Sequence, residues 1–302
     1  MENKKNNDQK RIMTVESLFC DQIAPEKIVL AGMRDLENEL TKNFRTEQET
    51  RIQAERHNAV LQKSFLSSLS EDSRNKEAVS ALKQLELKRS KIKLSAPKVA
   101  KDRERIFTGS IAATVPPPFN YQWTWNAGSG SPSNLDVAAN RNTGNMNFYL
   151  HTNSNHSSSG SGRTALGIYF RPMTENGILR LSANPAINFN WWDICAFASA
   201  HTDAFMGLYV GRYNLSGGFD GAVVNQQISL WNDSSWWSGG SGSGSNSGFP
   251  LSAQFNVDGS HWYAMWIWCG GNVSADGWHT FSGSGAGASL SVAVPSITWE
   301  LF

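Results

Sequence analysis

The feature that most constrains this chain is an abrupt change in composition near residue 101. No lysine follows Lys101, whereas all 12 tryptophans and 25 of the 26 glycines lie beyond it. Residues 1–105 hold 22 of the 27 Lys and Arg and 17 of the 26 Asp and Glu, a net charge of +5, and the rest of the chain is at −4. At 302 residues the chain is also about twice the length of a typical domain. We therefore expect a helical region (1–97), a linker (98–105) and a head domain (106–302).

The first region has a helical pattern. Apolar residues recur every three to five positions, at Ile28, Met33, Leu36, Leu40 and Phe44, and the pattern resumes after a polar stretch. A continuous helix over residues 26–68 would be about 65 Å long, too long for this chain alone to bury. The pattern therefore predicts a coiled coil in which identical chains supply the missing surface, and hence a homo-oligomer. A solvated arm is the alternative, and whether residues 70–97 fold back or extend the rod stays open.

Beyond residue 105 the pattern changes to that of β-strands. Apolar or alternating runs of strand length cover residues 143–151, 164–171, 177–183, 204–213, 222–231, 261–269 and 289–301. Many short strands without an amphipathic helix between them predict an antiparallel β-sandwich, most simply of the jelly-roll kind.

Two details of the β region add to this prediction. Both faces of residues 261–269 are apolar, so this strand should be covered on both sides, by a second layer or by a neighbouring subunit. Three Gly/Ser tracts, at residues 153–162, 238–248 and 282–289, should be flexible surface loops, because they carry little apolar surface to bury.

Composition excludes several classes of protein. The apolar runs are shorter than the roughly 18–20 residues of a membrane-spanning helix, and the charged first residues do not resemble a secretory signal. We therefore expect synthesis in the cytoplasm, with later release as part of a virion or another particle possible. Three widely spaced cysteines predict neither a disulfide framework nor a zinc site. Five scattered arginines in the head do not favour nucleic-acid binding.

The sequence gives little support for catalysis. It has no nucleophile elbow, phosphate loop or metal-binding helix motif, and its histidines lack the spacing of metal ligands. His201 and Asp203 would share one side of a strand, so that an imidazole–carboxylate contact is possible. We interpret them as a polar pair at a strand end. The prediction is a non-enzymatic protein without catalytic residues, metal or cofactor.

The excess of aromatic residues is the main indication of function. Trp191 and Trp192 should point to opposite sides of a strand, so only one of them can lie in the core. An exposed indole beside amides and carboxylates suits a sugar, because its flat ring covers C–H groups while its neighbours bond hydroxyls. The predicted saccharide-binding residues, at loop edges, are Asn232, Asp233, Trp236, Trp237, Trp278 and His279. Packing within the sandwich or between subunits is the alternative role of these tryptophans.

A helical shaft followed by a Gly/Ser/Asn/Trp-rich β head resembles the tail fibres and receptor-binding proteins of bacteriophages and related injection particles. The resemblance is one of architecture and rests on no specific motif. It implies a trimer whose heads bind a cell-surface glycan or another receptor. The alternatives are a self-assembling fibre, shell or appendage subunit, and a membrane-acting toxin with a helical arm.

Overall fold

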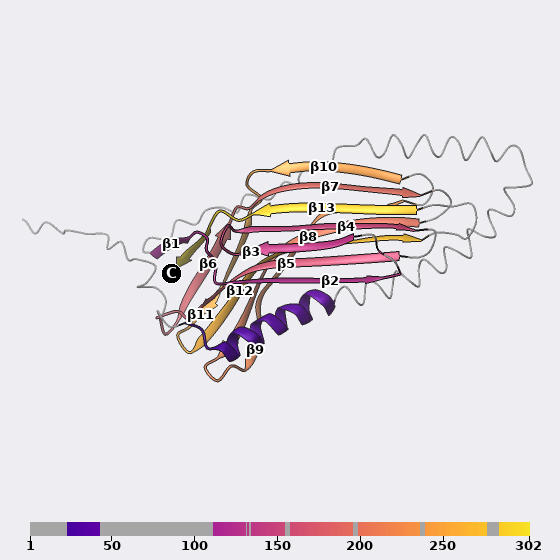
Figure 1. Cartoon of the computed structure of the whole chain (residues 1–302). Helices are drawn as coiled ribbons and strands as arrows, with labels where there is room; N and C mark the ends of the chain where they lie inside the picture. Colours follow the sequence, from indigo (N-terminus) through magenta and orange to yellow (C-terminus); the bar gives the residue numbers. More distant parts are fainter. Residues whose placement is uncertain are drawn as a thin grey trace, which may run out of the picture.

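The computed structural model of the chain describes residues 23–42, 111–130, 132, 134–154, 158–195, 199–235, 239–276 and 284–302. Within these residues one helix, at 26–42, and fourteen strands are present, and the strands form three antiparallel sheets (Figure 1). The sandwich predicted from the strand pattern is therefore confirmed. Two of the sheets have five strands and the third has four.

The first five-stranded sheet, here called the covered sheet, has the order β2-β5-β12-β8-β9. Its strands are β2 (Tyr121–Ser129), β5 (Ser158–Phe170), β12 (His261–Asp276), β8 (Ser199–Asn214) and β9 (Phe219–Ser235). The second, here called the open sheet, has the order β10-β7-β13-β4-β3. Its strands are β10 (Gly239–Asn246), β7 (Ala186–Cys195), β13 (Ser284–Ala293), β4 (Asn145–Ser154) and β3 (Asn134–Asn140).

The four-stranded sheet continues the open sheet beyond a bend. Its order is β1-β14-β6-β11, with β1 (Ile111–Val115), β14 (Ile297–Leu301), β6 (Gly177–Ala183) and β11 (Leu251–Val257). The neighbours β14, β6 and β11 lie next along the chain to β13, β7 and β10, which are also neighbours in the open sheet. Three adjacent strands therefore change direction together, at short connections that include Pro185, Pro250 and Pro295.

The pairing of the strands is nested in the manner of a jelly roll. From the outermost pair inward, β4 pairs with β13, β5 with β12, β7 with β10, and β8 with β9. The chain from β4 to β13 is thus one long hairpin wound so that successive pairs alternate between the two five-stranded sheets. Strands β2 and β3 add one more member to each sheet.

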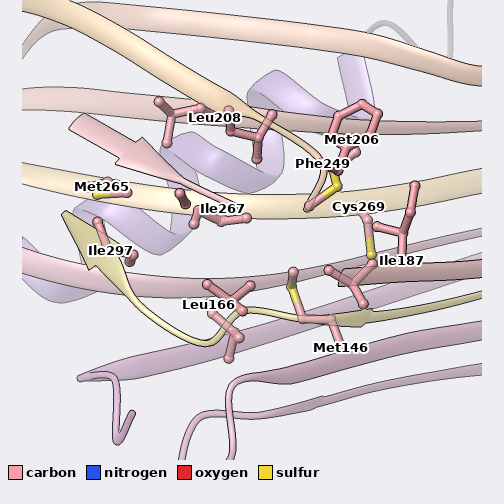
Figure 2. Packing of buried hydrophobic residues seen from close by; sticks show 14 of the residues in the cluster. Met146, Leu166, Ile187, Met206, Leu208, Phe249, Met265, Ile267, Cys269 and Ile297 are labelled. Atoms are coloured by element: carbon pink, nitrogen blue, oxygen red, sulfur yellow. The ribbon is translucent and has the colours of Figure 1, made fainter. Parts of the chain in front are cut away.

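The core lies between these sheets and is filled by aliphatic and aromatic side chains from both (Figure 2). Leu166, Met265 and Ile267 from the covered sheet face Met146 and Ile187 from the open sheet. Towards the four-stranded sheet, Trp299 meets Phe170 edge to face, with ring centroids 4.3 Å apart. Alternation along each strand decides which residues enter this core.

The helix at residues 26–42 lies on the outer side of the covered sheet (Figure 1). Ile28 and Leu36 are fully buried there against a layer of aromatic side chains. The members of this layer that are buried are Tyr169, Tyr209, Tyr213, Trp262, Trp266 and Trp268. The Tyr169 hydroxyl donates a hydrogen bond of 3.0 Å to the Val29 carbonyl oxygen, so a polar contact also fixes the helix in place.

The coiled-coil prediction is wrong for this helix. Its apolar stripe, which includes Ile28, Leu36 and Leu40, is buried against the chain's own sheet and not against another copy. The apolar stripe therefore does not support a homo-oligomer, because the chain's own sheet already supplies the surface that buries it. The remainder of the predicted rod, residues 43–97, lies outside the described residues.

The packing of the helix on the covered sheet also explains why both faces of strand β12 are apolar. Tyr263, Met265 and Ile267 point into the core, while Trp262, Trp266 and Trp268 point toward the helix. The prediction that residues 261–269 are covered on both sides is confirmed, and the second cover is a helix of the same chain.

The loop prediction for the Gly/Ser tracts is wrong where the tracts are described. Residues 158–162 lie in β5, 239–246 form β10, and 284–289 begin β13. The reason is the lack of a Cβ atom: at Gly242 it would lie 2.6 Å from the indole nitrogen of Trp191, and at Gly244 it would lie 2.6 Å from the Phe189 ring. Glycine makes room for large neighbours, so these tracts form strands without supplying apolar side chains of their own.

Candidate functional site

The outward side of the open sheet, here called the open face, is the most distinctive surface among the described residues. No described helix covers it, and side chains along β3, β4, β7 and β10 alternate between the core and solvent. Its outward side chains are mainly amides, hydroxyls and aromatic rings: Asn134, Asp136, Asn140, Asn145, Asn147, Tyr149, His151, Asn188, Asn190, Trp192, Ile194, Ser241, Ser243, Ser245, Ser289 and Ser291.

Trp192 lies across the neighbouring strand β13. A Cβ atom at Gly287 would lie 2.6 Å from Cε2 of the indole ring, and one at Gly285 would lie 3.2 Å from Cζ3. The first distance is shorter than real Cβ contacts and the second is tighter than most of them, so glycine at residue 287 in particular lets the ring lie close to the sheet. The indole is half-buried, with part of it left at the surface.

Two further rings extend this aromatic area on β4. His151 lies in the same row as Gly287 and Trp192, and its ring meets the indole at 5.3 Å between centroids and 61° between planes. Tyr149, 44% exposed, follows at 6.5 Å from His151. The three rings form a continuous aromatic strip across β7, β13 and β4.

Groups that form hydrogen bonds surround this strip. Asn190 and Ser289 share the row of Tyr149, and the hydroxyl of Ser289 donates to the backbone carbonyl oxygen of Asn190 at 3.3 Å. Asp136 is the carboxylate of the described open face, which contains no lysine or arginine. The surface thus presents flat apolar rings among mostly neutral donors and acceptors.

The structure does not bring the binding residues predicted from sequence together on one surface. Asn232 is exposed on the outer side of β9, whereas its neighbour Asp233 is half-buried and points inward. They cannot contact one ligand from the same surface, because adjacent residues in a strand face opposite ways. The other four predicted residues, Trp236, Trp237, Trp278 and His279, lie outside the described residues.

The prediction for Trp191 and Trp192 is confirmed in its geometry. Trp191 is 5% exposed and belongs to the core, and Trp192 points outward. Trp192 was not among the binding residues predicted from sequence, because its partners Tyr149 and His151 come from a strand more than 40 residues away. The available signal was the outward residue of a Trp-Trp pair together with a Gly-x-Gly pattern at residues 285–287.

Behind the open face, on the inner side of β7, Asp193 is buried between the two sheets. Its Oδ1 atom accepts hydrogen bonds from the Ser235 hydroxyl, at 2.9 Å, and from the Gly240 amide. Burial, opposed by these hydrogen bonds and reinforced by the nearby Asp233 carboxylate, raises the pKa of Asp193 to about 7. A proton shared between the Asp193 and Asp233 carboxylates would link β7 of the open sheet to β9 of the covered sheet.

Neither a metal site nor a membrane-spanning helix is found in the described part of the chain. There, no cluster of three or more His, Cys, Asp or Glu side chains could hold a metal ion. Among the same residues, no helix has both the length and the apolar character needed to span a membrane.

Comparisons with known proteins add no assignment. No protein-family model and no curated protein matches this sequence. The class of the chain therefore rests on its fold, a jelly-roll sandwich with a helix on one face, and its function on the geometry of its surfaces.

Proposed function

We propose that this protein binds a glycan on the open face, through Trp192, His151 and Tyr149 and the surrounding Asn and Ser side chains. The observation that supports the proposal is the indole of Trp192 lying across Gly285 and Gly287, in line with two more rings. In the wider role that we infer, the protein recognises a saccharide or receptor on a cell surface.

A sugar matches this surface better than other ligands. The C–H side of a pyranose ring is apolar and flat and can stack on an indole, while its hydroxyls both donate and accept hydrogen bonds. Amide side chains such as Asn188, Asn190 and Asn147 also offer both functions. Nucleic acid fits poorly, because binding phosphates requires clustered positive charge.

The fold is compatible with glycan binding but does not by itself indicate it. Jelly rolls include lectin domains as well as virus capsid subunits, so the argument depends on the side chains of the open face. No residue on the described open face forms a nucleophile–base pair with its neighbours, and we propose that this surface binds without cleaving.

A glycan array with the full chain, followed by calorimetric titration of the best ligand, tests the proposal. Trp192→Ala should weaken binding at least about tenfold, equivalent to about 1.4 kcal/mol. Ile194→Ala is the matched control, because Ile194 lies on the same strand and the same side, is 59% exposed and has no ring. Unchanged binding by Trp192→Ala, or equal losses in both variants, would disprove the role of the open face.

The double variant Trp236→Ala/Trp237→Ala separates this proposal from the loop-edge site predicted by sequence. Binding that survives in the double variant and is lost in Trp192→Ala supports the open face. The reverse result would support the loop-edge site.

A structural subunit is the second candidate. One observation favours it: β10 is an edge strand of alternating glycine and serine, and an edge of this kind can pair with a strand from another copy. Electron microscopy and light scattering of the purified chain test this candidate. Polymers that disappear in Ser243→Lys, which places a charge on this edge, would favour the structural role, and discrete particles would count against it.

A further inference from the structure

A second group of residues, on the covered sheet, has a different chemistry. His201 and Asp203 lie two residues apart on β8, and β9 places Ser234 opposite His201 and Asn232 opposite Asp203. All four side chains point to the outer side of the sheet, at the end of the strands away from the helix that covers Trp262 and Tyr213. Ser234 is exposed, His201 is half-buried and Asp203 is buried.

The two partners of His201 favour one tautomer of the neutral ring. Its Nε2 atom is 2.9 Å from Oδ2 of Asp203, and its Nδ1 atom is 2.6 Å from Oγ of Ser234. An ionised carboxylate can only accept, so Nε2 carries the hydrogen and Nδ1 of the neutral ring does not. The Ser234 hydroxyl must then donate its proton to Nδ1.

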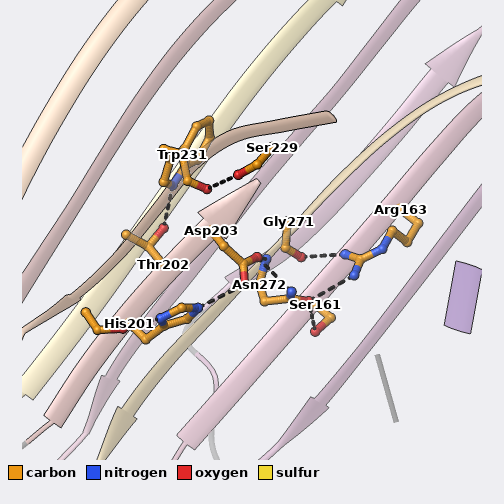
Figure 3. Close-up of polar contacts among 10 residues, drawn as sticks. Ser161, Arg163, His201, Thr202, Asp203, Ser229, Trp231, Gly271 and Asn272 are labelled. Carbon is orange, nitrogen blue, oxygen red and sulfur yellow. Dashed lines mark hydrogen bonds and ion pairs between the residues drawn. The ribbon is translucent and has the colours of Figure 1, made fainter. Parts of the chain in front are cut away.

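The carboxylate of Asp203 is itself held in position (Figure 3). Its Oδ1 atom accepts from the backbone amide of Asn272, at 3.0 Å, and from the Asn272 side-chain amide, at 2.7 Å. The side-chain oxygen Oδ1 of Asn272 in turn accepts from the Ser161 hydroxyl, at 2.9 Å, and from the Arg163 guanidinium, at 3.1 Å. This network leaves Oδ2 of Asp203 directed at the imidazole and stabilises its charge.

We propose that Ser234, His201 and Asp203 form the nucleophile, base and orienting carboxylate of an acyl-transfer centre that hydrolyses small esters. The serine is hydrogen-bonded to a histidine, and the histidine is hydrogen-bonded to a buried carboxylate. This arrangement activates a hydroxyl for attack on a carbonyl carbon. The centre lies on the sheet opposite to the open face and does not depend on the proposed glycan binding.

The reaction balances with water as the second substrate. Ser234 Oγ bonds to the ester carbonyl carbon as its proton passes to Nδ1 of His201, and that proton then goes to the alcohol oxygen as the C–O bond breaks. Water attacks the acyl-serine and gives a proton to His201, which returns it to Ser234 as the carboxylic acid leaves. We include Asn232, exposed on the same side of β9 two residues before Ser234, as the side-chain amide that would donate to the developing oxyanion.

Covalent labelling of the full chain with a fluorophosphonate probe tests the proposal, with the adduct located by peptide mass spectrometry. We expect one adduct, on Ser234, at least tenfold above that on the exposed Ser241 of β10. Ser234→Ala should abolish the adduct, and His201→Gln should reduce it at least tenfold. Equal labelling of Ser234 and Ser241, or no labelling of Ser234 in a folded wild-type chain, would overturn the proposal.

Hydrolysis of 4-nitrophenyl acetate provides a second readout. The wild-type rate above the uncatalysed background should be lost in Ser234→Ala, together with its pH dependence. Asp203 is a positioning residue, so Asp203→Asn should lower the rate at least tenfold and change the pH profile. Ser252→Ala, which changes an exposed serine on β11 of the four-stranded sheet, is the control. A rate and profile unchanged in Ser234→Ala, which replaces an exposed side chain and should still fold, would also overturn the proposal.

Discussion

The two outer faces of the sandwich use aromatic residues in opposite ways. On the covered sheet, Trp262, Trp266 and Trp268 are almost fully buried beneath the helix, where they contribute to packing. On the open face, Trp192 and Tyr149 remain accessible among amides and hydroxyls. A tryptophan-rich sequence therefore identifies neither a core nor a binding site. Whether a helix covers the face decides whether its rings pack or remain accessible.

The largest expected effect comes from removing one tryptophan from each face. Trp266→Ala should lower the free energy of unfolding by about 3–5 kcal/mol, because it leaves a cavity under the helix. Trp192→Ala should lower it by about 1 kcal/mol, because its ring is only half-buried. Chemical denaturation measures both values, and Trp266→Phe offers a milder change if the alanine variant does not fold. Equal losses would remove the distinction between the faces.

Asp193 tests whether stability can change through a buried group behind the open face while glycan binding on that face stays the same. The folded state raises its pKa from 3.8 to about 7, so the folded chain holds the proton more tightly than the unfolded chain. Stability from this group is present below about pH 4 and is lost as the pH rises toward 7. Relative to wild type, Asp193→Asn should therefore gain up to about 4 kcal/mol between pH 4 and pH 8.

Denaturation at a series of pH values measures this difference, and Asn188→Ala, on the exposed side of β7, is the control because it changes no titratable group. Glycan binding by Asp193→Asn should match that of wild type. A pH-independent difference between Asp193→Asn and wild type would show that Asp193 is ionised in the folded chain.

Gly32 tests how closely the helix fits the covered sheet. A Cβ atom at this position would lie 3.0 Å from Cζ of Tyr169 and closer still to its hydroxyl oxygen. Gly32→Ala should therefore lower the free energy of unfolding by about 1–3 kcal/mol through overpacking, despite the higher helix propensity of alanine. Leu30→Ala, on the exposed side of the helix, should change it by less than about 0.5 kcal/mol. A more stable Gly32→Ala would mean that the helix can move away from the sheet without cost.

The smallest effect should come from a polar contact that belongs to neither face. Asp258, at the connection from β11 to β12, accepts hydrogen bonds from Ser260, at 2.8 Å, and from His261, at 2.6 Å. Burial opposes them, but these bonds hold the pKa of Asp258 below its usual value, so its stabilisation is present above about pH 4 and is lost as the pH falls. Asp258→Asn should cost about 0.5–1 kcal/mol at pH 7 and nothing at pH 2, as measured by thermal unfolding.

The strand pattern was sufficient to predict an antiparallel sandwich, because alternation along a strand is a local property of the sequence. It was also sufficient to predict that Trp191 and Trp192 face opposite ways. The helix was predicted in its position, but its partner was not. A narrow apolar stripe on a helix fits another helix or an aromatic sheet equally well, and the spacing of Ile28, Leu36 and Leu40 does not distinguish the two.

The sites depended on contacts between distant strands. His201 and Asp203 were recognised as neighbours, but Ser234 joined them only through the pairing of β8 with β9. Likewise, His151 reaches Trp192 because β13 lies between their strands and carries glycine at residue 287. The glycine tracts had been interpreted as loops since glycine alone favours no strand, and their role became visible only beside the rings that they accommodate.

By itself, the sequence determined that an antiparallel sandwich forms, that its apolar strands alternate and that a helix begins near residue 26, because these follow from the preferences and spacing of residues near one another. Only the tertiary structure decided which face the helix covers, which tryptophans remain exposed and which polar groups meet. Those outcomes depend on the order in which the fourteen described strands pair, and strands far apart in the chain leave no mark of their pairing in the local pattern.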